Sequence, residues 1–169
     1  MVQDPPTTLG YVPARRDLRN DSGGGQSRPS VPWAVVYYQA PDGTVHADDF
    51  LCKCPGKIEA EFIAVLDAVA AAPPPQFSGG GKWESMHDAM AGWYEVRLTG
   101  PGREQFRLFC LLENGAADEL ARRGLPGPAI AVITGMRKPW RTTFSERDYA
   151  HVRELGRDYK QNVPRRLAT

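Results

Sequence analysis

The sequence predicts one small α+β domain, in which helices pack on a small, mainly antiparallel sheet in the order β-α-(α)-β-β-β-α. Two stretches of alternating apolar and polar residues flank a short segment rich in Gly and Pro, which is the pattern of a β-hairpin. Another stretch has apolar residues at helical spacing. The 169 residues are 41% hydrophobic and 24% charged, a composition and length that favour a single globular domain.

The chain is expected to divide into a tail, a folded domain and a second, short tail. Residues 1–30 contain four prolines, the run Gly23–Gly25 and almost no apolar periodicity, which predicts a flexible N-terminal tail. The domain is expected over residues 31–162, followed by a C-terminal tail over residues 163–169. No stretch approaches about 18 apolar residues, and the first residues lack a signal-peptide pattern. We therefore expect a cytoplasmic protein without membrane contacts.

The first half of the domain is expected to hold a strand and a helix. Trp33–Tyr38 is rich in β-branched and aromatic residues, and the turn-forming Pro41–Gly43 ends this strand. A helix is predicted where one apolar stripe recurs at helical spacing, through Ile58, Phe62, Val65, Leu66 and Val69. Pro73–Pro75 cannot continue that helix, so residues 73–81 are expected to be a loop. Residues 82–91 are expected to form a short second helix.

The second half is expected to hold three strands and a helix. The alternating stretches Trp93–Leu98 and Arg103–Leu112 form the hairpin. A third strand is expected at Ala129–Ile133, after a long loop over residues 113–128. Ser145 to Asp148 resembles a capping box and opens a helix to about Gln161, with one apolar face made of Tyr149, Val152, Leu155 and Tyr159.

The alternation in the hairpin places two arginines on one face of the sheet. Arg97 and Arg107 both point away from the apolar residues of their strands, hence away from the core. Two registers satisfy this pattern: Arg97 opposite Arg107, or Glu95 opposite Arg107. Directly opposed like charges destabilise a hairpin unless an anion lies between them. Arginine is also the side chain best shaped to bind a phosphate through two parallel hydrogen bonds.

Basic residues gather in the second half of the chain. Residues 1–91 carry 7 Lys+Arg and 11 Asp+Glu, whereas residues 92–169 carry 14 and 9. The third strand leads into Arg137, Lys138, Trp140 and Arg141, and the last helix presents a stripe of Arg153, Arg157 and Lys160. Basic and aromatic side chains together suit a single-stranded nucleic acid, which offers phosphates and stackable bases. The alternative for the helix is that its arginines are solvated or paired with Glu154 and Asp158.

The cysteines and histidines do not predict a metal or another cofactor. Cys52 and Cys54 form a C-x-C pair, Cys110 stands alone, and the three histidines are isolated in sequence. A zinc site would need a second Cys or His pair at suitable spacing. We expect reduced, structural thiols and no cofactor.

Four short segments, residues 92–98, 104–109, 133–138 and 158–159, follow the order of the expected elements. In this order they resemble the "glycine, aromatic, Tyr-Glu-x-Arg" segment, the "Tyr/Phe-Arg-x-Phe/Tyr" strand, the "hydrophobic-x-Gly-Phe-x-Lys" strand end and the "Arg-x-x-Asp-Tyr" helix end of HigB-type toxins, in the phage-derived HigB-like branch of the RelE/ParE superfamily. The resemblance covers about residues 31–162. It implies a RelE-like fold and the toxin role of a type II toxin–antitoxin system.

The activity that the resemblance implies is metal-independent cleavage of mRNA, often on the ribosome. The implied partner is a cognate antitoxin, commonly with a helix-turn-helix DNA-binding domain. Two alternatives on the same fold stay open: a ParE-like protein that binds a topoisomerase, or an inactive phage-derived domain that binds only its partner. The basic cluster over residues 135–141 favours RNA, because a protein partner does not require it.

RNA can be cut without a metal when its 2′-OH attacks the adjacent phosphate, which leaves a cyclic phosphate and a free 5′-OH. The protein must then stabilise charge on the phosphoryl oxygens and move protons at both ends of the reaction. For this chemistry the candidates are Arg97 and Arg107 on the phosphate, assisted by Arg137 or Lys138, with Tyr159 in proton transfer or stacking and Glu95 as general base. The residues expected to bind RNA outside the reacting centre are Trp140, Arg141, Arg153 and Arg157.

Overall fold

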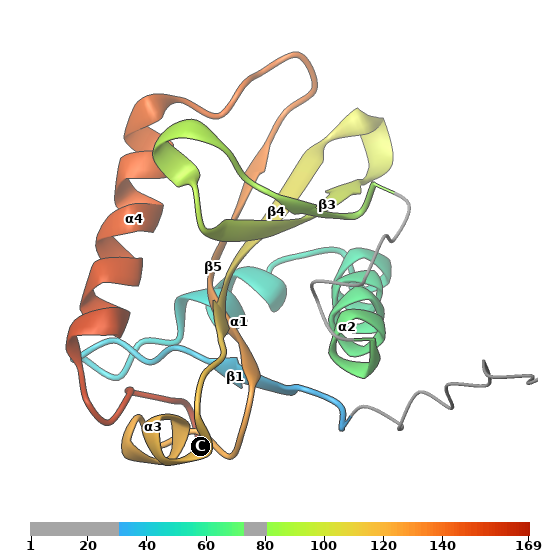
Figure 1. Ribbon diagram of the computed structural model, residues 1–169. Helices are drawn as coiled ribbons and strands as arrows, with labels where there is room; N and C mark the ends of the chain where they lie inside the picture. The colour runs from blue at the N-terminus through green and yellow to red at the C-terminus, as the bar shows by residue number, and fades with distance from the viewer. Residues whose placement is uncertain (1–30, 73–80) are drawn as a thin grey trace, which may run out of the picture.

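A five-stranded mixed sheet organises the protein (Figure 1). The computed structural model describes residues 31–72 and 81–169, so the expected tail over 1–30 and nearly all of the expected loop over 73–81 lie outside the described residues. The strand order is β1-β5-β4-β3-β2, with bounds Ala34–Tyr37, Ala129–Lys138, Gln105–Glu113, Trp93–Thr99 and Trp83–Ser85. Only β1 and β5 run parallel among these pairs, so the expected mainly antiparallel α+β sheet is confirmed.

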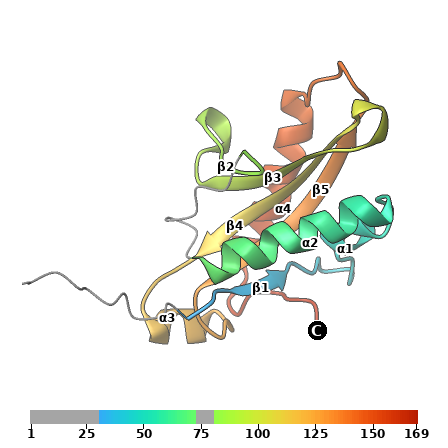
Figure 2. The ribbon, with the colours of Figure 1, turned by 90° about the vertical axis from the view of Figure 1, so that its right-hand side faces the viewer.

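Helices cover both faces of the sheet. The helices are α1, α2, α3 and α4, with bounds His46–Leu51, Gly56–Ala71, Ala117–Arg122 and Glu146–Gln161. Figures 1 and 2 show α2 against one face and α4 against the other. One apolar core lies under α2, with residues of α1 in it, and a second lies under α4, so a side chain on the sheet belongs to either the α2 face or the α4 face. No helix in the described ranges is long and apolar enough to cross a membrane.

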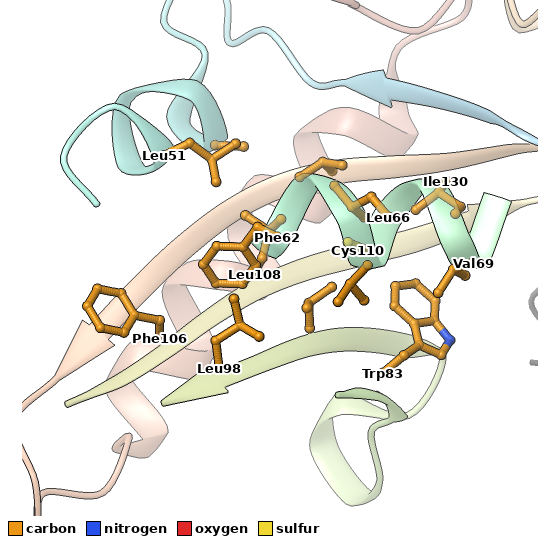
Figure 3. Close-up of a cluster of buried hydrophobic side chains, with 14 of the residues drawn as sticks. Leu51, Phe62, Leu66, Val69, Trp83, Leu98, Phe106, Leu108, Cys110 and Ile130 are labelled. Atoms are coloured by element: carbon orange, nitrogen blue, oxygen red, sulfur yellow. The ribbon is translucent and has the colours of Figure 1, made fainter. Parts of the chain in front are cut away.

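The helix predicted from the apolar stripe is α2. All five stripe residues are buried, and they meet β3, β4 and β5 side chains such as Leu108 and Cys110 (Figure 3). The last helix also matches its expectation. The Ser145 hydroxyl accepts from the Asp148 N–H at 3.2 Å, and the Asp148 carboxylate accepts from the Ser145 N–H at 2.7 Å, which completes the capping box. Gly156 lets α4 approach the sheet, because a Cβ there would lie 2.3 Å from the Trp93 ring.

Three expectations about local structure are wrong. The helix expected over 82–91 is instead the strand β2 followed by a 3-10 turn at Asp88–Met90. The alternation of buried Trp83 with half-exposed Glu84 fits an edge strand paired to β3, and the Trp83 ring stacks on Tyr94 at 5.2 Å. The loop expected over 113–128 contains the short helix α3, and β5 continues past Ile133 to Lys138 because it stays paired with β4.

The C-terminal residues pack against β1. Leu167 forms an antiparallel bridge with Tyr38, and the Ala168 N–H donates to the Tyr37 carbonyl at 2.9 Å. This segment is held by a buried carboxylate: Glu113, 5% exposed, accepts from Arg123 Nη1 at 2.6 Å and from Arg165 Nε at 2.7 Å. We call Glu113, Arg123 and Arg165 the Glu113 cluster. Although residues 163–169 were expected to be a tail, they are part of the packed structure.

Candidate functional site

The hairpin adopts the register in which Arg97 lies directly opposite Arg107. Of the two registers that alternation allowed, this is the one with like charges opposed. Glu95 is two residues along β3 and lies opposite Phe109 on β4 and Glu84 on β2. Because residues two apart in a strand share a face, these side chains form one group on the α4 face. We call Glu84, Glu95, Arg97 and Arg107 the β3–β4 cluster.

Carboxylates lie between and beside the two arginines. Glu95 Oε1 lies 3.6 Å from Arg97 Nε, and its Oε2 lies 3.6 Å from Arg107 Nε. Glu84 forms a closer ion pair with Arg97. These carboxylates reduce the like-charge repulsion across the ladder, so the register does not itself require a bound anion. The Glu95 contacts are longer than hydrogen bonds, so the arginine donors aimed at it are not saturated.

Glu95 is the carboxylate of the cluster whose pKa is raised. Its side chain is 12% exposed, and burial raises its pKa above the usual glutamate range. The charges of Arg107 and Arg97 lower the pKa again, but they do not cancel the effect of burial. A carboxylate with a raised pKa is a stronger base than an exposed glutamate, which suits it to accept a proton.

Arg107 is more enclosed than alternation predicts. Its side chain is only 11% exposed, where a surface position was expected. Helix α4 and the segment before it account for the difference, since the guanidinium lies 5.8 Å from the centre of the Phe144 ring. Arg107 Nη2 donates to Gln105 Oε1 at 2.9 Å, and Nη1 donates to the Phe106 carbonyl at 3.0 Å. These contacts hold the guanidinium in one orientation.

An open depression adjoins the cluster at the end of the sheet. It encloses about 440 Å³ and is lined by Arg97, Thr99, Arg103, Gln105, Arg107 and Trp140. Three of these six residues are arginines, and none is acidic. The depression therefore offers a polar, cationic surface beside the β3–β4 cluster.

Only one of the two basic residues expected at the end of β5 joins this face. Lys138 is paired with Gln105 in the ladder, and its Nζ lies 3.1 Å from Asp148 and 6.0 Å from the Phe144 ring centre. Arg137 lies one residue earlier and opposite Phe106, whose ring is buried on the α2 face. Its Nε is 3.7 Å from a Glu104 oxygen. Since successive residues of a strand point to opposite faces, Arg137 is not brought to the β3–β4 cluster.

Tyr159 is not brought to the cluster either. It is fully buried, its ring faces Arg165 at 5.1 Å, and burial together with the charge of Glu113 raises its pKa. The tyrosine at the site is Tyr149, ten residues earlier and about 15 Å along α4. Its ring packs edge-on against Phe109 at 6.2 Å. Burial raises the Tyr149 pKa first, the Glu95 charge raises it further, and Arg107 lowers it.

The four residues expected to bind RNA occupy two places. Trp140 is 47% exposed and borders the depression, with the Arg141 guanidinium 4.4 Å from its ring centre. Arg153 and Arg157 lie on α4, away from the residues that line the depression. Arg153 is paired with Glu146, and not with Glu154 or Asp158, which the sequence offered as partners. Arg157 is exposed and makes none of the ion pairs formed within residues 31–72 and 81–169.

Sequence reasoning missed four residues of this surface: Glu84, Arg103, Phe144 and Tyr149. Glu84 was assigned to a helix, so its place opposite Glu95 was hidden. Tyr149 was recognised as a helix-face residue, but periodicity cannot say which of the two tyrosines on that face lies beside the arginines. The basic turn residue Arg103 follows Gly102, a pairing that indicates an exposed tip.

Within residues 31–72 and 81–169, no three His, Cys, Asp or Glu side chains gather as ligands for a metal ion. Comparison with known proteins finds that no family model and no curated protein matches the sequence. Among solved structures, the chain is similar to the crystal structure of the toxin–antitoxin complex RelBE2 from Mycobacterium tuberculosis. The identity is 16%, the match covers 64% of this chain and 93% of that chain, and the TM-score is 0.39.

Proposed function

We propose that this protein is the toxin of a type II toxin–antitoxin system and cleaves mRNA at the β3–β4 cluster. The observation that carries the proposal is the placement of Arg97 and Arg107 in register, with Glu95 3.6 Å from each and an open cationic depression beside them. The motif resemblance over residues 92–98 and 104–109 supports it, because these two segments build the cluster.

The proposed reaction is attack of a ribose 2′-OH on the adjacent phosphorus atom. Glu95 accepts the 2′-OH proton, the new bond forms from the 2′ oxygen to phosphorus, and the bond to the 5′ oxygen breaks. Arg97 and Arg107 stabilise the charge that develops on the non-bridging oxygens. The products are a 2′,3′-cyclic phosphate and a 5′-OH.

The leaving 5′ oxygen needs a proton, and Tyr149 is the candidate that supplies it. A tyrosine phenol is protonated at neutral pH and so can donate a proton, and the charges of Glu95 and Arg107 both act on its pKa. The phenolate formed in this step is restored when the Glu95 proton returns through solvent. Tyr149 takes the place proposed for Tyr159 from the sequence, because Tyr159 is buried at the other end of α4.

A substrate phosphate must compete with the carboxylates of the cluster. The Arg97–Glu84 pair is the one that yields, because its side chains are 39% and 41% exposed and exposed ion pairs contribute about 0–1 kcal/mol. The Glu95 contacts at 3.6 Å leave guanidinium donors available. Lys138 lies on the same face, but its ammonium group is paired with Asp148.

The proposed partners are a cognate antitoxin of the helix-turn-helix type and mRNA. If cleavage depends on translation, the mRNA is cut while it is bound to the ribosome. An antitoxin that covers the arginine-bearing face would bring acidic segments there, because complementary charge speeds association. Co-expression of the neighbouring reading frame tests this: it should co-purify with the chain and relieve the growth defect that the chain causes. A neighbour that does neither contradicts the pairing.

One observation favours a second candidate, a non-nucleolytic protein that binds a partner through the same face. The β3–β4 cluster holds two arginines and two glutamates, so it is balanced in charge before any ligand binds. A balanced polar patch suits a protein interface as well as a phosphate. The two candidates differ in whether RNA is cut.

The deciding experiment incubates the purified chain with end-labelled single-stranded RNA in EDTA, alone and with ribosomes. A matched RNA carries one 2′-deoxy nucleotide at the mapped cleavage position. We expect 2′,3′-cyclic phosphate and 5′-OH ends, and no cleavage at the 2′-deoxy position. Arg97→Lys should lower the rate, whereas Arg122→Lys, an exposed charge on α3, should not. Absence of cleavage under both conditions, or cleavage that survives the 2′-deoxy substitution, contradicts the proposal.

A further inference from the structure

Two arginines from different turns meet on one exposed tryptophan. The Arg103 guanidinium lies 4.7 Å from the centre of the Trp140 ring, and the Arg141 guanidinium lies 4.4 Å from it. Arg103 belongs to the β3–β4 turn, and Arg141 to the segment between β5 and α4. Figure 1 shows both connections at the same end of the molecule, opposite α3. We call Arg103, Trp140 and Arg141 the tip cluster.

Both arginines have a backbone conformation that ordinarily selects glycine or asparagine. The φ angles are +60° at Arg103 and +64° at Arg141. Each lies at the third position of a turn closed by a hydrogen bond, from Glu104 N to the Pro101 carbonyl at 3.3 Å and from Thr142 N to the Pro139 carbonyl at 3.1 Å. A strained conformation at a long cationic side chain points to a function for that side chain.

Among the residues that the structure describes, no carboxylate pairs with the arginines of the tip cluster. Within residues 31–72 and 81–169, Arg103 and Arg141 form no ion pair, in contrast to Arg97 and Arg107. Contact with the face of an indole holds a guanidinium without neutralising it. Two positive charges held near each other at an exposed surface favour an anion that touches both.

The tip cluster continues the depression beside the β3–β4 cluster. Arg103 and Trp140 line the same depression as Arg97 and Arg107. Along the hairpin, Thr99 and Gln105 separate Arg97 and Arg107 from the turn, a distance of about 7 Å for two residues of a strand. An extended polyanion that reaches one group of arginines therefore passes the other.

We infer that the tip cluster binds the backbone phosphates of single-stranded RNA next to the phosphate that reacts, with Trp140 as a positioning residue rather than a platform for a base. The inference rests on the proposed function, because it places the reacting phosphate at Arg97 and Arg107. Arg103 is the new binding residue. Trp140 holds both guanidiniums, so a base reaches its ring only by displacing one of them.

The test uses the full chain and a fluorescent single-stranded RNA in which every 2′-OH is methylated, so that it binds without being cut. Arg103→Asn and Arg141→Asn remove the charge and keep a residue that tolerates positive φ. Each should weaken binding several-fold and lower the slope of log affinity against log salt by about 0.7, the value for one lost phosphate contact on a single strand. Trp140→Leu should also weaken binding, although both charges remain. Arg122→Asn is the control and should change neither affinity nor slope.

Thermal unfolding separates this role from a structural one. The two Asn variants should melt at or above the wild-type temperature, because backbone strain is relieved while binding is lost. The inference is overturned if the double variant Arg103→Asn/Arg141→Asn has the wild-type slope of log affinity against log salt. It is also overturned if the wild-type chain binds a polyglutamate peptide but not the RNA. If wild type cuts ordinary RNA and the double variant binds normally, only the tip cluster proposal fails. If wild type binds with the expected slopes but never cuts, only the proposed cleavage fails.

Discussion

In two places on the sheet a glutamate lies between two arginines, Glu113 at the end of β4 and Glu95 on β3, but the two groups are built differently. At the Glu113 cluster, both carboxylate oxygens accept charge-assisted hydrogen bonds, at 2.6 and 2.7 Å. At the β3–β4 cluster, both Glu95 contacts are 3.6 Å long. Burial raises the pKa of each carboxyl; the arginine bonds outweigh burial at Glu113, whose pKa is lowered, and do not at Glu95.

The difference separates an ion cluster whose carboxylate oxygens are both used within the protein from one whose groups can still bind a ligand or a proton. Glu113 uses its acceptors to fasten α3 and the C-terminal segment to β4. Glu95 retains acceptor capacity, and its arginines border an open surface. Residue types alone do not distinguish the two groups, whereas distance, saturation and access do.

The largest expected effect on stability comes from breaking the Glu113 cluster. Glu113→Ala leaves Arg165, whose side chain is 8% exposed, without its carboxylate. Removing one partner of a buried ion pair costs about 3–5 kcal/mol. Chemical denaturation should show this loss in the free energy of unfolding. Glu119→Ala is the matched control, since its pair with Arg123 is 38% exposed on the acidic side, and it should cost less than about 1 kcal/mol. A small effect at Glu113 would remove the contrast.

The opposite result is expected for Glu95→Gln. The Glu95 contacts are longer than hydrogen bonds and burial already disfavours the charged form, so a neutral isostere should change the free energy of unfolding by less than about 1 kcal/mol. RNA cleavage should fall by about 10²-fold or more, because a positioned general base contributes about 10²–10⁴-fold. Single-turnover cleavage and denaturation on the same preparations measure both. A variant that unfolds, or that cleaves at the wild-type rate, shows that Glu95 resembles Glu113 after all.

The two carboxyls should change stability with pH in opposite directions. The lowered pKa of Glu113 gives stability that is present above the unfolded pKa near 4.3 and is lost as pH falls through the folded pKa. The raised pKa of Glu95 gives stability that is full below pH about 4.3 and is lost as pH rises through its folded pKa. Unfolding free energies of wild type, Glu113→Gln and Glu95→Gln, measured across roughly pH 2–7, should therefore give difference curves of opposite slope. Difference curves whose slopes have the same sign would contradict the lowered pKa at Glu113 and the raised pKa at Glu95.

Arginines outside both clusters should give the smallest effects. Arg157 on α4 is exposed, and we expect Arg157→Gln to weaken RNA binding about two-fold at low salt, with the difference lost at high salt. Arg153→Gln should have even less effect, because Arg153 is paired with Glu146. Fluorescence anisotropy at several salt concentrations measures both. A loss of affinity as large as that expected for Arg103→Asn would move the RNA-binding surface onto α4.

The hairpin and the last helix could be predicted because their patterns are local. Alternation in residues 93–98 and 103–112, and the Ser145–Asp148 capping box, depend on neighbours in sequence. The same pattern narrowed the register to two choices. The choice between them depends on the turn, where Gly102 and Arg103 both have positive φ. An arginine in the sequence does not indicate this conformation, because glycine and asparagine are the usual residues there.

The parts that could not be predicted depend on contacts between distant residues. Glu113 and Arg165 are 52 positions apart, so nothing near residues 163–169 shows that this segment packs. Tyr149 and Tyr159 share one helix face, and only the way α4 crosses the sheet decides which one lies near enough to Arg107 to be affected by its charge. The enclosure of Arg107 by Phe144 likewise comes from a separate segment. Short helices such as α1, with two buried residues, carry too little periodicity to be recognised.

The β3–β4 cluster is proposed to act on RNA and the Glu113 cluster to hold the fold, and the most direct test exchanges one arginine of each cluster for lysine. Lysine keeps the charge but loses the planar donor pair. We predict that Arg107→Lys keeps the wild-type unfolding temperature and loses about 10²-fold in single-turnover RNA cleavage, as expected when a donor to the transition state is removed. Arg123→Lys should lower the unfolding temperature and, well below it, cleave at the wild-type rate. Equal cleavage by Arg107→Lys and wild type, or unfolding of Arg107→Lys with Arg123→Lys unaffected, would contradict the division between the two clusters.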